Sequence, residues 1–248
     1  LADGLRQAKG RAALLVALAD LGGVWDLDAV TGALSDLADA AVQRAITHLV
    51  AQAQGAGKLP QVDAPDGGLV ALAMGKLGAR ELNYSSDIDL ILLFDDSLYP
   101  ADDYAEIRQQ FIRIGRGLVK LIGEETASGY VFRTDLRLRP DPSVTPVCIG
   151  MGAAESYYES QGRTWERGAY IRARPCAGDI AAGEAFLEAL TPFVWRRHLD
   201  YAAVQDAHDM RLRIRDHKGL GGPLRLPGHD VKLGRGGIRE IEFFTQTR

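Results

Sequence analysis

Residues 69–94 read LVALAMGKLGARELNYSSDIDLILLF, two short apolar runs separated by a polar segment that contains glycine. The runs Leu69–Met74 and Ile88–Phe94 have the length of buried strands and are short for helices. The segment between them, Gly75–Asp87, is polar and is expected to form a loop with room for one helical turn. This stretch therefore predicts a strand, a loop and a second strand in succession.

Two aspartates stand at the start of the second run. Asp87 and Asp89 are separated by one residue, so on a strand their side chains point to the same face. A pair of charges is costly to bury without partners, and carboxylate oxygens are ligands that Mg²⁺ and Mn²⁺ prefer. We therefore interpret Asp87 and Asp89 as metal ligands. The alternative is a pair of surface carboxylates in a turn, because D-x-D alone is a short motif.

A third strand is predicted over Gly129–Leu138, where apolar and polar residues alternate until Pro140 ends the pattern. The alternation places Arg133, Asp135 and Arg137 on one face. Asp135 would then supply the third carboxylate of a site for two metal ions, and the arginines would neutralise phosphate charge. Ion pairs between Asp135 and the arginines, with no metal, are the alternative.

Helical patterns lie on both sides of these strands. Residues 1–57 predict two or three helices, and Gly55–Gly68 is turn-forming and is expected to be a linker. Asp103–Glu124 has apolar residues at intervals of three or four and predicts a long amphipathic helix. Further helices are expected at Ala154–Gln161, Trp165–Ala173, Ala181–Leu190 and Asp200–Asp216.

The composition is that of a globular protein, with 46% hydrophobic and 25% charged residues among 248. Its apolar runs are far shorter than the roughly 20 residues that span a bilayer, and no secretory signal is visible, so we expect no membrane segment and a cytoplasmic protein. Cys148 and Cys176 have neither the spacing of a zinc site nor that of a disulfide framework, and we expect both to be reduced.

The net charge of −4 is unevenly distributed. Residues 1–130 hold 11 basic and 18 acidic side chains, whereas residues 131–248 hold 18 basic and 15 acidic ones. A duplex-binding domain usually has a basic surplus throughout, so this asymmetry favours a phosphate-bearing substrate and argues against nucleic acid as a partner. A solvated arginine-rich face is the alternative interpretation.

The order of these elements resembles that of the polymerase-β-like nucleotidyltransferases: a strand ending in glycine, a D-x-D strand, a long helix and an aspartate on a third strand. Several blocks further resemble the family of glutamine synthetase adenylyltransferases and adenylyl-removing enzymes. They are Gly75–Leu90, Arg133–Pro140, Tyr157-Tyr158, Gln161–Arg167, Arg172–Arg174 and Lys232–Phe243. The resemblance covers nearly all of residues 30–248.

This resemblance implies an α+β fold, a polymerase-β-like sheet with flanking helices. It divides the chain into a helical N-terminal segment (1–57), a nucleotidyltransferase core (58–150) and a mostly helical segment (151–248) that completes the domain. Since a helical pattern begins at Ile238 and the sequence stops at Arg248, we expect the chain to be a piece of a longer protein.

The family's full enzymes have two similar catalytic halves with opposite tasks, and this chain resembles the adenylyl-removing half. The adenylylating half typically has a glycine near Ser85 and a histidine near Arg167. The implied reaction is phosphorolysis of the adenylyl-tyrosine bond on glutamine synthetase, in which phosphate enters and ADP leaves. An ATP-dependent adenylyltransferase and a non-catalytic module that binds a nucleotide or a signal protein are the rival functions.

The resemblance also implies roles for individual residues. Mg²⁺ or Mn²⁺ would be held by the three aspartates Asp87, Asp89 and Asp135. Phosphate groups would be bound by Gly75, Lys76, Ser86, Arg133 and Arg137. The implied partners are glutamine synthetase, a PII-type signal protein, phosphate and ADP or ATP.

Overall fold

The computed structural model describes residues 1–195, 205, 208, 209, 212, 213, 216–220, 222 and 227–246. The chain divides into two compact units. Unit 1 comprises Leu1–Gln161 and Arg172–Leu190, and unit 2 comprises Gly162–Ile171 and Thr191–Arg248. Residues on both sides of Gly55–Gly68 belong to unit 1. The domain limits expected at 57/58 and 150/151 stay predictions.

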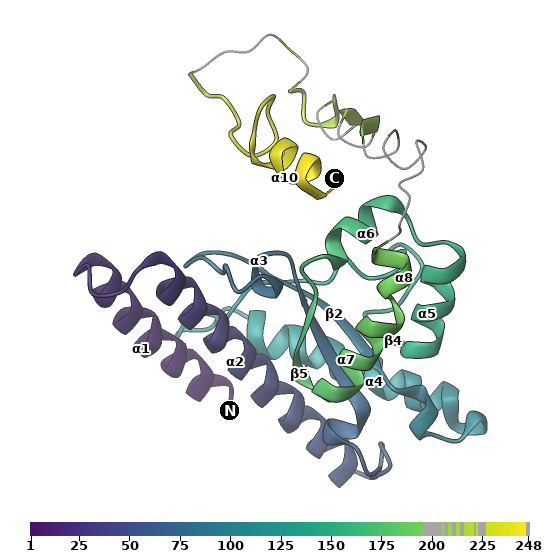
Figure 1. Ribbon diagram of the computed structural model, residues 1–248. Helices are drawn as coiled ribbons and strands as arrows, with labels where there is room; N and C mark the ends of the chain where they lie inside the picture. Colours follow the sequence, from purple (N-terminus) through teal and green to yellow (C-terminus); the bar gives the residue numbers. More distant parts are fainter. Residues whose placement is uncertain are drawn as a thin grey trace. The chain divides into compact units, whose positions relative to one another are not determined.

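Unit 1 is built on a small mixed sheet (Figure 1). The central strands β1 (Leu69–Met74) and β2 (Ile88–Phe94) are antiparallel, and β5 (Arg174–Gly178) pairs antiparallel with β1 on the other side. Two short strands lie parallel to β2: β3 (Thr134–Asp135) beside its beginning and β4 (Cys148–Gly150) beside its end. All of β1 is buried, which explains its unbroken apolar sequence.

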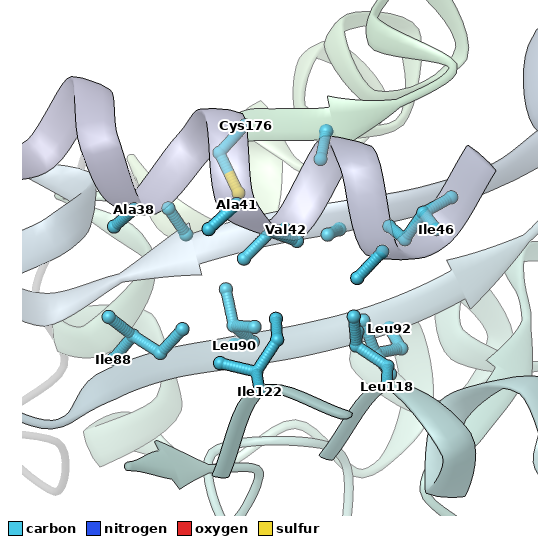
Figure 2. Close-up of a cluster of buried hydrophobic side chains, with 14 of the residues drawn as sticks. Ala38, Ala41, Val42, Ile46, Ile88, Leu90, Leu92, Leu118, Ile122 and Cys176 are labelled. Carbon is cyan, nitrogen blue, oxygen red and sulfur yellow. The ribbon is translucent and has the colours of Figure 1, made fainter. Parts of the chain in front are cut away.

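Two long helices, α2 (Leu27–Gly55) and α4 (Tyr104–Gly123), cover one face of the sheet. Figure 2 shows alternate residues of β2 pointing into this core. The core includes Ala38, Ala41, Val42 and Ile46 of α2, Ile88, Leu90 and Leu92 of β2, and Leu118 and Ile122 of α4. Because strand side chains alternate, Asp87 and Asp89 lie on the opposite face. Farther along that face, α7 (Ile180–Ala189) packs with Gly183 against Val70.

The remaining helices are mostly shorter. In unit 1 they are α1 (Ala2–Leu21), the 3₁₀ turns η1 (Pro65–Gly68), η2 (Asp96–Leu98) and η3 (Ala101–Asp103), the helical turn α3 (Gly75–Gly78), and α5 (Met151–Ser160). Unit 2 contains α6 (Thr164–Tyr170), α8 (Thr191–Val194) and α10 (Ile238–Gln246).

The predicted framework is confirmed for the two central strands, for two N-terminal helices and for the amphipathic helix, which the structure has as α4. The polar segment between the strands contains the helical turn α3. The helices expected near residues 154–161, 165–173 and 181–190 appear as α5, α6 and α7. The helix predicted at Asp200–Asp216 lies largely outside the described residues.

The predicted strand Gly129–Leu138 is wrong in length, because only Thr134–Asp135 pairs with β2. Before them, the N–H groups of Val131 and Phe132 are donated to the Ile122 carbonyl at the end of α4. After them, the Arg137 N–H is donated to the Asp135 carboxylate at 2.8 Å, not to a neighbouring strand. Local hydrogen bonds therefore end the ladder on both sides.

Strands β4 and β5 were not predicted. The β5 sequence, Arg174-Pro175-Cys176-Ala177-Gly178, has no β-branched residue and contains a proline. It forms a strand because it lies beside β1 at the edge of the sheet, with a register shift near Pro175, where a missing N–H is tolerated. The whole is a mixed α/β structure with a small sheet and many helices. Among the described residues, no helix has the length and apolar character needed to cross a membrane.

Candidate functional site

The two aspartates of the D-x-D motif lie at the start of β2, on the face opposite α2 and α4. Asp89 is paired in register with Met74 of β1 on one side and with Asp135 of β3 on the other. Residues paired across neighbouring strands project to the same face. The register therefore places Asp89 beside Asp135, and Asp87 directly precedes β2. That the three carboxylates form one site stays a prediction.

The turn α3 follows β1 directly and touches this acidic face. Gly75 has a φ of +53°, a conformation that favours glycine, and a Cβ at this position would lie 2.8 Å from Asp89 Oδ2. Gly75 is therefore needed for the backbone to approach the carboxylate. Lys76, the next residue, is exposed, and its carbonyl accepts a hydrogen bond from the Glu81 N–H.

Ser86 belongs to a tight turn just before the motif. Its N–H is donated to the Asn83 carbonyl at 3.2 Å, and its hydroxyl accepts the Asn83 N–H at 3.4 Å. The hydroxyl is thus close to the acidic face but is used within the turn. Neighbouring Tyr84 donates its hydroxyl to Asp20 of α1, which ties this turn to the N-terminal helix.

Arg133 is paired with the first aspartate of the motif. Its Nε lies 2.6 Å from Asp87 Oδ1, and its Nη2 donates to the Ser85 carbonyl. Its Nη1 donates to the Tyr130 hydroxyl, and Lys9 of α1 lies over the same aromatic ring. The hydrogen bond and the charge of Asp87 raise the pKa of the Arg133 guanidinium.

Asp135 and Arg137 form a fork with two nitrogen donors. Arg137 Nε lies 3.0 Å from Oδ1 and 2.9 Å from Oδ2, and Nη2 also donates to Oδ2. The Arg137 side chain is 84% exposed, whereas that of Asp135 is only 18% exposed. The hydrogen bonds from Arg137 lower the pKa of Asp135. The pKa of the Arg137 guanidinium is raised, first by its hydrogen bond to Asp135 and then by the negative charges of Asp135, Asp89 and Asp87.

The carboxylates do not form a ready metal cluster in this conformation. Among the described residues, no group of three or more His, Cys, Asp or Glu side chains is arranged to hold a metal ion. Asp87 and Asp135 are each paired with an arginine. The donor set itself suits a hard divalent cation, since it consists of carboxylates on neighbouring strands. Metal ligation by these residues stays a prediction.

The sequence pattern gave no role to Tyr130, whose hydroxyl accepts a hydrogen bond from Arg133 Nη1. It also gave no role to Arg174 of β5, whose guanidinium donates to the carbonyl of Leu77 in the turn α3. No spacing rule connects Arg174 with Leu77, which lies 97 positions away. Tyr130 is only three residues from Arg133, but the predicted strand alternation put the two on opposite faces. The expected reduced state of the cysteines is confirmed, because Cys148 and Cys176 are free, buried thiols whose pKa burial raises far above its usual range.

Comparison with protein families matches residues 1–189 to glutamate-ammonia ligase adenylyltransferase and residues 208–248 to GlnD PII-uridylyltransferase. Similar curated proteins come from Bradyrhizobium sp. (strain BTAi1), Xanthobacter autotrophicus and Agrobacterium fabrum, each 54% identical over 248 residues. All three are named bifunctional glutamine synthetase adenylyltransferase/adenylyl-removing enzyme, and each alignment covers 98% of this chain and 25% of the relative. The chain spans about a quarter of the length of these relatives.

Proposed function

This chain belongs to the glutamate-ammonia ligase adenylyltransferase family, and on that premise we propose that it is an adenylyl-removing catalytic domain. Its relatives carry the name of a nucleotidyltransferase enzyme that acts on glutamine synthetase. In the proposed reaction, a phosphate oxygen attacks the phosphorus of the AMP group on a tyrosine of that enzyme. The bond from phosphorus to the tyrosine oxygen breaks, ADP leaves, and the tyrosine side chain is unmodified again. The proposed setting is the cytoplasm, in the control of nitrogen assimilation.

The proposed fold is that of the polymerase-β-like nucleotidyltransferases. Its support is the order of elements in unit 1: strand β1, the glycine turn α3, the D-x-D strand β2, the long helix α4 and the aspartate on β3. One observation carries the functional proposal most directly, namely the register that pairs Asp89 with Asp135 across β2 and β3. That register gathers acidic side chains from distant parts of the sequence on one face.

Asp87, Asp89 and Asp135 are the residues that would hold Mg²⁺ or Mn²⁺. When bound, such ions polarise a phosphoryl group and stabilise the charge on the attacking and leaving oxygens. The arginines that now pair with Asp87 and Asp135 are largely exposed, with side chains 53% and 84% accessible. Exposed ion pairs contribute little to the free energy of folding, so little free energy is needed to open them for a ligand.

The same arginines are suited to bind the phosphate groups of the substrate. Guanidinium groups bind phosphate through paired N–H donors, and Arg133 and Arg137 flank β3 and pair with Asp87 and Asp135. Lys76 adds a mobile positive charge from the turn, Gly75 lets the backbone approach closely, and Ser86 offers a hydroxyl. The tyrosine oxygen is a fair leaving group, with a pKa of about 10, which reduces the need for a strong general acid.

The direction of the reaction rests on resemblance. Ser85 and Arg167 stand where the adenylylating half typically has glycine and histidine. The proposed regulatory partner is a PII-type signal protein, and its support is the match of residues 208–248 to PII-uridylyltransferase.

The decisive experiment incubates the chain with Mg²⁺, adenylylated glutamine synthetase and phosphate, and measures ADP. We expect ADP in this mixture and no adenylylation when unmodified glutamine synthetase is given with ATP. The reverse result would identify an adenylyltransferase, and no turnover in either mixture would favour a non-catalytic module.

A matched pair of variants ties the activity to the site. Asp89→Asn removes a carboxylate from the acidic face, and Asp102→Asn removes an exposed one from η3, beyond the other end of β2. Only Asp89→Asn should abolish ADP formation. Equal effects of the two changes would refute the assignment of the site to the start of β2.

A further inference from the structure

The turn α3 touches the acidic face at one end and is held by β5 at the other. At its beginning, Gly75 leaves no space for a side chain between the backbone and Asp89 Oδ2. At its end, Gly78 lies so close to the Arg172 carbonyl that a Cβ would come within 2.0 Å of that oxygen. Close contacts therefore fix both ends of this four-residue turn, and one of them is with the Asp89 carboxylate.

Arg174 fixes the same end of the turn by a hydrogen bond. Its Nη2 donates to the Leu77 carbonyl at 3.1 Å, and Leu77 itself is fully buried. The register adds to the constraint, because Arg174 is paired with Ala73, which lies two residues before the turn on β1.

The Arg174 guanidinium is in turn held by Asp39 of α2. Its Nη1 lies 2.7 Å from Asp39 Oδ2, and its Nη2 lies 3.0 Å from Asp39 Oδ1, a fork pair. The side chains of Arg174 and Asp39 are only 23% and 17% exposed, in contrast to the 84% of Arg137. This pair therefore joins α2, β5 and the turn, and water competes with it far less than with the arginine pairs of the acidic face.

We propose that the Arg174–Asp39 pair is a positioning element that holds the Gly75–Gly78 turn against Asp89 and so sets the affinity of the acidic face for a divalent cation. The inference rests on the proposed function for the cation site, but not on the direction of the reaction. Neither residue touches the reacting atoms. Groups that hydrogen-bond a metal ligand directly typically change metal affinity or activity by about 10–100-fold when they are lost. For a pair that acts through the turn we expect an effect near the lower end of that range.

The test measures binding of Mn²⁺ alone to the chain, by electron paramagnetic resonance, together with the melting temperature. The variant is Arg174→Met combined with Asp39→Leu, which removes both charges and leaves neither one buried without a partner. We expect the Mn²⁺ dissociation constant to rise at least about tenfold while the protein remains folded.

The matched control removes the exposed pair Arg80–Asp36, which also joins α2 to the end of the turn. Arg80→Gln with Asp36→Asn should leave Mn²⁺ binding unchanged. Should the first double variant fail to fold, Arg174→Lys keeps the charge opposite Asp39 but cannot form the fork, and it should show the same weakening.

Wild-type Mn²⁺ affinity in a folded Arg174 variant would overturn the inference, and so would an equal loss in the Arg80 control. A wild-type chain that binds no Mn²⁺ would overturn the cation site and this inference together. A chain that binds Mn²⁺ but releases no ADP from adenylylated glutamine synthetase would refute the proposed reaction, while the comparison of variants would still decide the role of Arg174.

Discussion

Two aspartates of this molecule are each held in a fork by an arginine, yet their proton affinities shift in opposite directions. For Asp39, burial outweighs the Arg174 contacts and raises the pKa of the carboxyl above its ordinary value of 3.8. For Asp135, the hydrogen bonds from Arg137 outweigh burial and lower the pKa below that value. The same pair of residue types therefore has different energetics at the two places.

The different environments of the two pairs indicate which arginine can leave its aspartate for another ligand. Arg137 lies in solvent, so its pair with Asp135 can open at little cost, as the proposed binding of phosphate and of a cation requires. The side chains of Arg174 and Asp39 are largely buried. Loss of either one therefore leaves the other charge without its partner in the protein interior, where water solvates it poorly. We assign the first pair to function and the second to support, and the following experiments test that division.

The largest expected effect comes from Asp135→Asn. If Asp135 is a metal ligand, nucleotidyl transfer should fall roughly 100-fold or more, since loss of about 3 kcal/mol of metal stabilisation has that consequence. The melting temperature should change little. Steady-state ADP formation and thermal unfolding of the same preparation measure both. A variant with wild-type rates would place Asp135 outside the site and leave only its ion pair with Arg137.

Next in size is the loss of stability in Arg174→Met. The change leaves Asp39 largely enclosed and unpaired, which should cost about 2 kcal/mol, less than for a completely buried pair because both side chains retain some exposure. Adding Asp39→Leu should restore most of this loss. Urea unfolding of the two variants checks the expectation, and a double variant no more stable than the single one would contradict it.

A smaller effect is expected for Arg137→Gln. Because the pair with Asp135 is exposed, the melting temperature should shift by less than about 4 °C. The KM for phosphate should rise, because the change removes the exposed guanidinium charge that we propose binds phosphate beside Asp135. If instead stability falls as far as in Arg174→Met, the two pairs do not differ in the way proposed here.

The pH dependence of stability should separate the two aspartates. The pKa of Asp39 is higher in the folded protein, so its contribution to the free energy of unfolding decreases as pH rises from 3.8 through the folded pKa. The pKa of Asp135 is lower in the folded protein, so its contribution increases as pH rises from the folded pKa to 3.8. The free energy of unfolding, measured with urea between about pH 3 and 6, checks this. Its decrease with pH should be absent in Asp39→Asn, and its increase with pH should be absent in Asp135→Asn. The same profile in both variants would refute the opposite shifts.

The smallest effect concerns the thiols. Cys176 lies in the buried region near Asp39, and Cys148 is buried beside β2. Burial disfavours the thiolate of each, so neither should react with a maleimide in the native protein, and both should react after unfolding. Labelling of Cys176 in the native protein would show that the buried region around Asp39 and Arg174 opens readily to solvent.

Much of the fold was predictable from local patterns. The two central strands carry apolar runs of the right length, and α4 has apolar residues at helical spacing, so local sequence suffices for both. The D-x-D motif placed Asp87 and Asp89 on one face for the same local reason. The alternation of residues 129–138 was misleading, because hydrogen bonds to Ile122 and to the Asp135 carboxylate take up the N–H groups that a longer strand would need.

The sequence by itself determined the two central strands, the glycine turn between them and the family to which the chain belongs, since these depend on residues close together in the chain. Only the tertiary structure decided that Asp135 stands in register with Asp89, that a proline-containing segment becomes β5, and that Arg174 reaches both Asp39 and Leu77. Those contacts join residues up to 135 positions apart. No periodicity specifies such a contact, because it exists only after separate elements have packed on one core.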